Sequence, residues 1–126
     1  MYSITVRDHI LISHSLKDRV FGPAQSLHGA TYVVDAEFKT KQLDEHNTVI
    51  DMGKVSKVLK QVCAGLNYQN LDDHSELSQQ LTTTEYLAWY IYREISKQVS
   101  SYFTGSLKVV LHESHIAWGS YEGDMG

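Results

Sequence analysis

Hydrophobic and polar residues alternate along two long stretches in the first third of the chain. Residues 2–14 alternate loosely and are rich in Ile, Val and Thr, and residues 28–40 alternate cleanly. This period of two is typical of a strand that is buried on one face. We therefore expect two long antiparallel strands joined by a loop over residues 15–26. The face of the second strand that we expect to be buried carries His28, Tyr32, Val34, Ala36 and Phe38.

The apolar spacing changes to three and four residues in two later stretches, which predicts two amphipathic helices. Asp51 can cap the first helix, and Thr82 or Thr83 can cap the second, which ends before Ser100. A polar stretch from Asn67 to Gln80 separates them. It is longer than a connection requires, which favours a functional or interface loop.

Two short strands, over residues 107–113 and 116–121, complete the predicted elements. The order ββααββ predicts an α+β fold in which two helices cover one face of a four-stranded antiparallel sheet. A chain of 126 residues is a single-domain length, so we expect one domain over residues 1–126.

Charge and composition indicate which kinds of binding partner, which location and which cysteine chemistry to expect. The formal net charge is −4 and Lys and Arg are spread without a cluster, so we expect no nucleic-acid role. No signal-peptide pattern and no apolar run of membrane-spanning length is present, so we expect a cytoplasmic protein without a membrane partner. Cys63 is the only cysteine and falls on a helix stripe, which favours a buried apolar role over a reactive thiol.

His14 and His28 lie on neighbouring predicted strands and are candidate zinc ligands. A catalytic zinc usually has three protein ligands and one open position. The third ligand on this face would be at position 30, but Ala30 cannot coordinate a metal. The alternatives are a weakened zinc site and two hydrogen-bonded structural histidines.

Further motifs follow one another in a fixed order along the chain. They are His14, Leu27-His28-Gly29-x-x-Tyr32, Val49-Ile50-Asp51-Met52, Leu66-Asn67-Tyr68-Gln69-Asn70-Leu71-Asp72, Thr83-Thr84-Glu85 and His112-Glu113-Ser114. This set resembles the 6-pyruvoyltetrahydropterin synthase and 6-carboxytetrahydropterin synthase family. The resemblance implies the tunnelling fold, in which protomers join edge to edge into a barrel, and a homo-oligomer that is a trimer or a hexamer. It also implies a small pterin-like ligand and zinc.

The resemblance assigns the pterin-anchoring position to Glu113. A carboxylate can accept two parallel hydrogen bonds from the amino group and ring N–H of a pterin. The alternative is an ordinary surface glutamate at a strand end. Thr83, Thr84 and Glu85 match residues that line the pterin pocket in the family, although a helix cap with an acidic first turn would also explain them.

The chain departs from the family pattern where the family carries its proton-transfer groups. Ala24 stands where bacterial members have a cysteine, and Asn67-Tyr68 stands where members have Asp-His. Tyr68 and His115 are tentative replacement catalytic residues, and a structural role for Tyr68 is the alternative. His115 would share the face of Glu113 if the strand continued past position 113.

These departures lead to two hypotheses about function. The first is a pterin synthase homologue that binds a pterin or a related GTP-derived heterocycle and catalyses an altered lyase, isomerase or hydrolase step. The second is a non-catalytic pterin-binding or scaffold protein. Retention of Glu113 and the threonines favours a site that still recognises its ligand.

Overall fold

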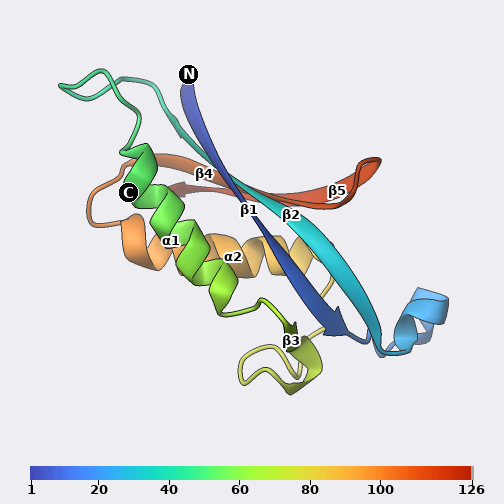
Figure 1. Cartoon of the computed structure of the whole chain (residues 1–126). Coiled ribbons are helices and arrows are strands. Elements are labelled where there is room, and N and C mark those ends of the chain that lie inside the picture. The colour runs from blue at the N-terminus through green and yellow to red at the C-terminus, as the bar shows by residue number, and fades with distance from the viewer. Residues whose placement is uncertain (126) are drawn as a thin grey trace.

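The fold consists of a twisted sheet with both α-helices packed against one of its faces (Figure 1). We call this the helix-covered face and the other the open face. The computed structural model describes residues 1–125. The elements are β1 (Tyr2–His14), η1 (Arg19–Gln25), β2 (His28–Thr40), α1 (Met52–Ala64), β3 (Gln69–Asn70), η2 (Leu71–Asp73), α2 (Thr84–Val99), β4 (Gly105–Ser114) and β5 (Ala117–Met125).

The sheet has five strands in the order β3-β1-β2-β4-β5. The predicted α+β class is confirmed, but the predicted four-stranded, wholly antiparallel sheet is wrong. The additional strand β3 pairs in parallel with β1 at Ile12 and Ser13. With only two residues, both polar, β3 is too short to show any alternation, and its pairing joins segments far apart in the sequence.

The hairpin of β1 and β2 has the predicted bounds and an unbroken register. Its pairs run from Tyr2↔Thr40 to His14↔His28. The two candidate zinc ligands therefore lie directly opposite each other where the hairpin begins its connection. Tyr32, Val34, Ala36 and Phe38 point toward the helices and are almost fully buried, as the alternation predicts.

Both helices begin at side-chain caps. Asp51 accepts a hydrogen bond from the Lys54 amide at 3.2 Å, and Thr83 accepts one from the Tyr86 amide at 3.2 Å. Of the two candidate caps for α2, Thr83 is the one used, which leaves the side chain of Thr82 available to another partner. No helix within residues 1–125 has the length and apolar character needed to cross a membrane.

The carboxy-terminal hairpin is longer than the sequence pattern indicated, because β5 continues through residues 122–125, where Glu122, Gly123 and Asp124 interrupt any alternation. Gly123 lets α2 approach closely, since an added Cβ would lie 2.5 Å from the Tyr92 Oη. β4 ends at Ser114 and His115 lies in the turn. The premise that the strand continues through His115 is therefore wrong.

The segment from Asn67 to Gln80 is partly folded rather than a simple loop. The Asn67 Oδ1 accepts a hydrogen bond from the Leu11 amide at 2.9 Å, and the Tyr68 amide donates to the Leu11 carbonyl at 2.6 Å. Leu71 and Leu77 are fully buried. Asn67 and Tyr68 thus occupy the hydrogen-bonding edge of β1 next to β3.

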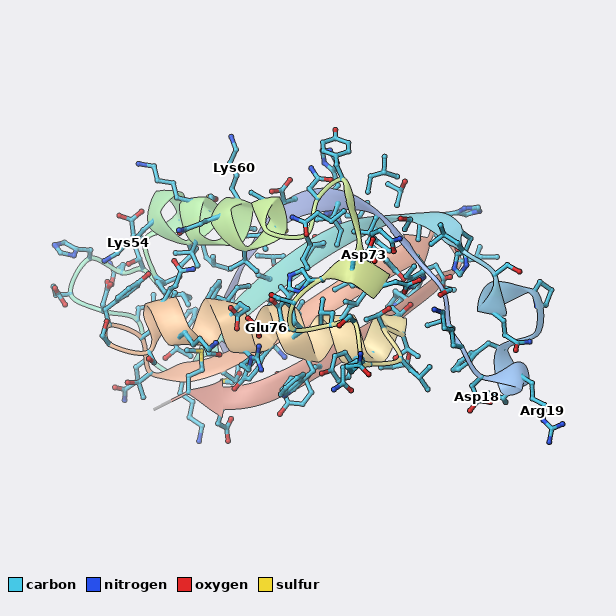
Figure 2. All side chains as sticks on the ribbon, turned by 90° about the horizontal axis from the view of Figure 1, so that it is seen from below. Asp18, Arg19, Lys54, Lys60, Asp73 and Glu76 are labelled. Carbon is cyan, nitrogen blue, oxygen red and sulfur yellow. The ribbon has the colours of Figure 1, made fainter. Side chains whose placement is uncertain are left out.

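The predicted loop between β1 and β2 contains the short helix η1. The Asp18 side chain caps it by accepting a hydrogen bond from the Val20 amide at 3.1 Å. Asp18 and Arg19 project beyond the end of the sheet, whereas Lys60 points outward from α1 (Figure 2). Ala24, which stands where the resemblance implies a cysteine in bacterial members, accepts a hydrogen bond from the Leu16 amide through its carbonyl oxygen.

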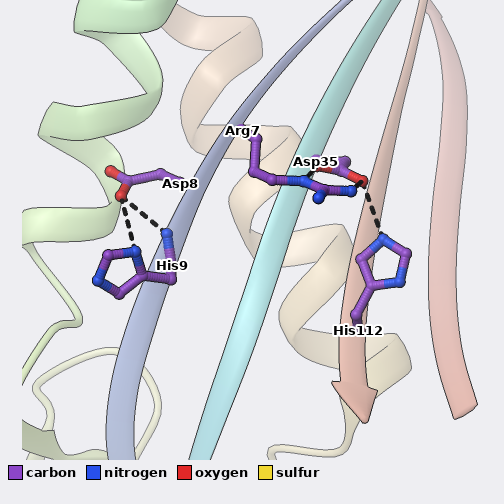
Figure 3. A network of polar contacts seen from close by, with 5 residues as sticks. All are labelled: Arg7, Asp8, His9, Asp35 and His112. Carbon is purple, nitrogen blue, oxygen red and sulfur yellow. Dashed lines mark hydrogen bonds and ion pairs between the residues drawn. The ribbon is translucent and has the colours of Figure 1, made fainter. Parts of the chain in front are cut away.

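Three side chains form a polar row across the middle of the open face (Figure 3). Arg7 binds both oxygens of Asp35, at 2.6 and 2.8 Å, and the His112 Nε2 lies 2.9 Å from the Asp35 Oδ2. The hydrogen bonds from Arg7 lower the pKa of Asp35, partial burial opposes this, and the bond from His112 adds to it.

This row predicts an acid-sensitive contribution to stability. Because the pKa of Asp35 is lowered in the folded protein, its carboxylate is protonated in the unfolded chain at a higher pH than in the folded one. Acidification through this range therefore favours unfolding. Asp35→Asn should therefore lower the Tm at pH 7, and the gap to the wild type should close as pH falls below about 4, the ordinary aspartate pKa. Thermal melts from pH 7 to pH 2 measure this. A gap that stays constant over that range would contradict the prediction, whereas Arg7→Gln should reproduce the effect.

Candidate metal and ligand site

His14 and His28 face each other at one end of the helix-covered face. Their ring centroids are 4.6 Å apart and the rings are inclined by 62°. The His14 side chain is buried, with its Nδ1 2.9 Å from the Thr82 Oγ1. The His28 Nδ1 lies 2.8 Å from the Ser26 carbonyl oxygen.

These contacts define which ring nitrogens are free. A carbonyl oxygen only accepts hydrogen bonds, so the His28 Nδ1 carries the proton and the lone pair of the neutral ring is on Nε2. In His14 the Nδ1 lies beside the Thr82 hydroxyl, and when this hydroxyl accepts from Nδ1 the lone pair of the neutral ring is again on Nε2. Metal-binding histidines commonly have one nitrogen held by an outer partner in this way. The pair therefore fits a divalent metal such as zinc.

Electrostatics favours the ligating form of His14. Burial lowers the pKa of His14 and the neighbouring His28 lowers it further, whereas Asp72, Thr82 and Glu113 oppose this shift. Since a histidine must be neutral to bind a metal, the lowered pKa keeps His14 competent near neutral pH.

A third ligand is not supplied by a nearby side chain of the same protomer. Across residues 1–125, the only group of three or more His, Cys, Asp or Glu side chains close enough to share an ion is Asp44, Glu45 and His46. These residues are exposed and follow β2, whereas His28 begins it. Asp44 also already accepts hydrogen bonds from Thr48 and from the His46 amide. The histidine pair thus offers a metal two ligands from this protomer.

Glu113 lies at an irregularity of the last hairpin. β4 and β5 pair at His112↔Trp118 and Ser114↔Ala117, and the register shifts between them. Such bulges re-aim side chains at strand ends. The exposed Glu113 borders a hollow of about 370 Å³ that Thr31, His112, Ser114 and His115 also line.

Glu113 and the start of α2 lie close to Tyr32. Burial raises the pKa of Tyr32, the Thr84 hydroxyl opposes this shift, and the charges of Glu113 and Glu85 add to it. The Glu113 charge also acts on His14. The predicted anchor, two of the predicted pocket residues and the candidate metal-ligand pair therefore gather at one end of the molecule. Thr83, the other pocket residue, caps α2 next to them.

The two tentative catalytic residues are placed differently. His115 borders the same hollow as Glu113, from the β4–β5 turn. Tyr68 has 80% of its surface exposed and its backbone binds the edge of β1. Cys63 is buried in α1, and burial raises its thiol pKa to about 12, so this thiol is not a nucleophile near neutral pH.

Several contributors to the site were not anticipated from the sequence. The sequence pattern offers Thr82 only as a helix cap, but in the structure its hydroxyl lies 2.9 Å from the His14 Nδ1. Asp72 accepts hydrogen bonds from the amide and the hydroxyl of Ser15, the residue that directly follows His14 in the chain. Each of these contacts joins segments more than 50 residues apart, so no local pattern predicts it. The one signal in the sequence is a second threonine, Thr82, beside the residue that caps α2.

Comparison with known families gives one match over almost the whole chain. A family model described as 6-pyruvoyl tetrahydropterin synthase matches residues 3–124. No curated protein sequence matches the chain.

Solved structures of the same description share the fold. The Caenorhabditis elegans 6-pyruvoyl tetrahydropterin synthase superposes with a TM-score of 0.84 at 21% identity, over 97% of this chain and 95% of that one. The Plasmodium vivax and Plasmodium falciparum enzymes give TM-scores of 0.79 and 0.80, each at 15% identity and 98% coverage of both chains. These similarities confirm the tunnelling fold.

Proposed function

Because the chain belongs to the 6-pyruvoyl tetrahydropterin synthase family, we propose that it binds a pterin or a related GTP-derived heterocycle and catalyses an altered lyase, isomerase or hydrolase step. The observation that carries this proposal is the position of Glu113. This residue borders a hollow, and the charge of its carboxylate acts on both Tyr32 and the candidate metal ligand His14. We include a cytoplasmic location in the proposal.

Glu113 supplies recognition of the ring. Two carboxylate oxygens can accept parallel hydrogen bonds from the amino group and the adjacent ring N–H of a pterin. Thr84 and Glu85 would complete the pocket from the first turn of α2. His14 and His28 would hold zinc, which when bound polarises oxygens of the ligand side chain.

One observation favours a non-catalytic alternative. Asn67 and Tyr68, which replace the family's Asp-His pair, bind the backbone of β1 at Leu11. The amide side chain of Asn67 does not ionise, so it cannot exchange a proton as an aspartate would. The family's proton relay is thus replaced by a structural contact, as expected of a protein that binds a pterin without converting it.

A turnover assay separates these functions. Untagged protein would be incubated with dihydroneopterin triphosphate, with product followed by chromatography, binding by fluorescence titration and zinc by elemental analysis. Turnover supports the altered enzyme, and saturable binding without turnover supports the alternative. Absence of both binding and turnover would remove the pterin proposal.

We extend the proposal to a homo-oligomer, a trimer or a hexamer, formed through the two sheet edges. β5 is an edge strand of nine residues, Ala117–Met125. At the other edge of the sheet β3 pairs only with Ile12 and Ser13 of β1. Asn67 and Tyr68 hydrogen-bond to the backbone amide and carbonyl of Leu11. The stretch Tyr2–Ile10 is left as a second edge of the same length and of opposite direction. Unpaired edges of this kind readily pair with another copy.

Proline substitutions at two consecutive positions of β5 test this interface. Amides of neighbouring residues point alternately to β4 and outward, and proline removes the amide donor. One of Ser120→Pro and Tyr121→Pro should mainly weaken the β4–β5 hairpin and lower the Tm. The other should shift the protein to monomer in light-scattering chromatography. Ser120→Ala and Tyr121→Ala are matched controls. If both proline variants keep the wild-type mass, the edge is not the interface.

A further inference from the structure

The Asp35–His112 pair on the open face has the geometry of a proton-transfer dyad. We infer that His112 is the catalytic acid–base residue of the Glu113 pocket and that Asp35 positions it. This inference rests on the proposed pterin function and deepens it. The pair is drawn from β2 and β4, so it is independent of Asn67 and Tyr68.

Hydrogen bonding fixes the tautomer of His112. The Asp35 Oδ2 already accepts from Arg7, and a carboxylate oxygen only accepts, so the His112 Nε2 donates across 2.9 Å. The lone pair of the neutral ring is therefore on Nδ1. A base oriented by a carboxylate through its opposite nitrogen is the arrangement that enzymes use to move protons.

Neighbouring side chains hold this dyad in place. Arg7 binds Asp35 through two nitrogens, and the Asp35 side chain has only 13% of its surface exposed. The Trp118 ring lies beside the His112 imidazole, with centroids 5.7 Å apart. The imidazole is thus fixed on one side by a carboxylate and on the other by an indole.

The bulge in β4 brings His112 and Glu113 to the same hollow. Strict alternation would place consecutive residues on opposite faces. The register shift between His112 and Ser114 breaks that alternation, and both His112 and Glu113 border the hollow of about 370 Å³. A ring held by Glu113 there would present the first carbon of its side chain near the His112 imidazole.

The step assigned to His112 is a proton transfer within the bound ligand. The Nδ1 takes a proton from the side-chain carbon attached to the pterin ring, and the electron pair of that C–H bond delocalises into the adjacent ring C=N bond. The imidazolium, stabilised by Asp35, then returns the proton to carbon. No oxidant or co-reactant is consumed, so the step balances as an isomerisation or an exchange.

Hydrogen exchange into a simple probe tests this assignment. 7,8-Dihydroneopterin would be incubated with the full chain in D₂O, and deuterium at the side-chain carbon followed by NMR. His112→Ala should lower the exchange rate by at least about 100-fold, the lower end of a general-base contribution. Added imidazole should restore part of it. Probe affinity should change much less than the exchange rate, because Glu113 is intact.

His9→Ala is the matched control. His9 lies in the same row of the sheet as His112 but beside Asp8, with Nδ1 3.8 Å from that carboxylate (Figure 3). The exchange rate of this variant should equal that of the wild type.

The pH profile separates proton transfer from a merely structural role. The charged or titratable groups around His112 are Arg7, Asp35, Glu113, His115 and, on β1, His9. Asp35→Asn should move the acidic limb of the exchange rate to lower pH, because the imidazolium loses its carboxylate partner. A purely structural loss would lower the rate equally at every pH.

Other outcomes overturn the inference in distinguishable ways. Wild-type exchange in His112→Ala, or probe binding without any exchange in the wild type, removes His112 as the acid–base residue and leaves the proposed binding function standing. Absence of probe binding in the wild type removes both.

Discussion

Ala30→His should tighten zinc binding by at least about 100-fold. Position 30 follows His28 on the same face of β2, and Ala30 packs beside the core next to the two ligands. The substitution adds a third imidazole to a two-ligand pair, completing the usual protein ligand set of a catalytic zinc. Loss of an outer-shell partner alone costs roughly 10–100-fold in metal affinity, so a direct ligand should exceed that range.

Competition against a chromophoric chelator measures this affinity in untagged protein. The wild type should lose zinc under mild chelation, and Ala30→His should retain it. Ala30→Leu adds bulk without a donor atom and serves as the control for packing. Adding His28→Ala to Ala30→His should cancel the gain. Tight stoichiometric zinc in the wild type would mean that another group, such as a carboxylate or a residue of a second copy, already supplies the third ligand.

Glu113→Gln should weaken pterin binding by about 1.5–3 kcal/mol, the range for a hydrogen bond to a charged group. This loss corresponds to roughly 10- to 150-fold in Kd. The amide keeps one acceptor oxygen but replaces the second with a donor, which faces the donor pair of the pterin. Fluorescence titration with dihydroneopterin, at one fixed salt concentration, measures the change.

The control for this variant is Glu45→Gln, which removes an exposed carboxylate from the loop after β2. It should leave the affinity unchanged while altering the net charge by the same amount. Thermal melts should show both variants folded, since Glu113 is exposed. Pterin affinity that is unchanged in Glu113→Gln would remove this residue as the anchor and point to a different ligand.

The elements that sequence reasoning placed correctly are those with a strong period. β1 and β2 have the predicted bounds, and Asp51 and Thr83 cap the helices as expected. Alternation and capping are local properties, so they are readable in a single sequence. β3 and the far end of β5 were missed because their pairing depends on residues distant in the chain, without a local pattern of their own.

The site shows the same division. The opposition of His14 and His28 follows from the predicted hairpin, but the Thr82 hydroxyl that orients His14 arrives from 68 residues away. In the sequence His112 stands only within the motif His112-Glu113-Ser114, and no local pattern gives it a role of its own. Its partner Asp35 belongs to another strand, and only the register of β2 with β4 brings the two together.

The contact between Asn67 and Leu11 limits how far another strand can pair along the exposed edge of β1. The Asn67 Oδ1 accepts the hydrogen bond of the Leu11 amide, and the Tyr68 amide donates to the Leu11 carbonyl. An incoming strand that lies along β1 must therefore halt before residue 11, so it cannot slip to a longer overlap. This limit on the paired length favours one strand register between two copies, and it disfavours the continuous edge-to-edge pairing that leads to fibres.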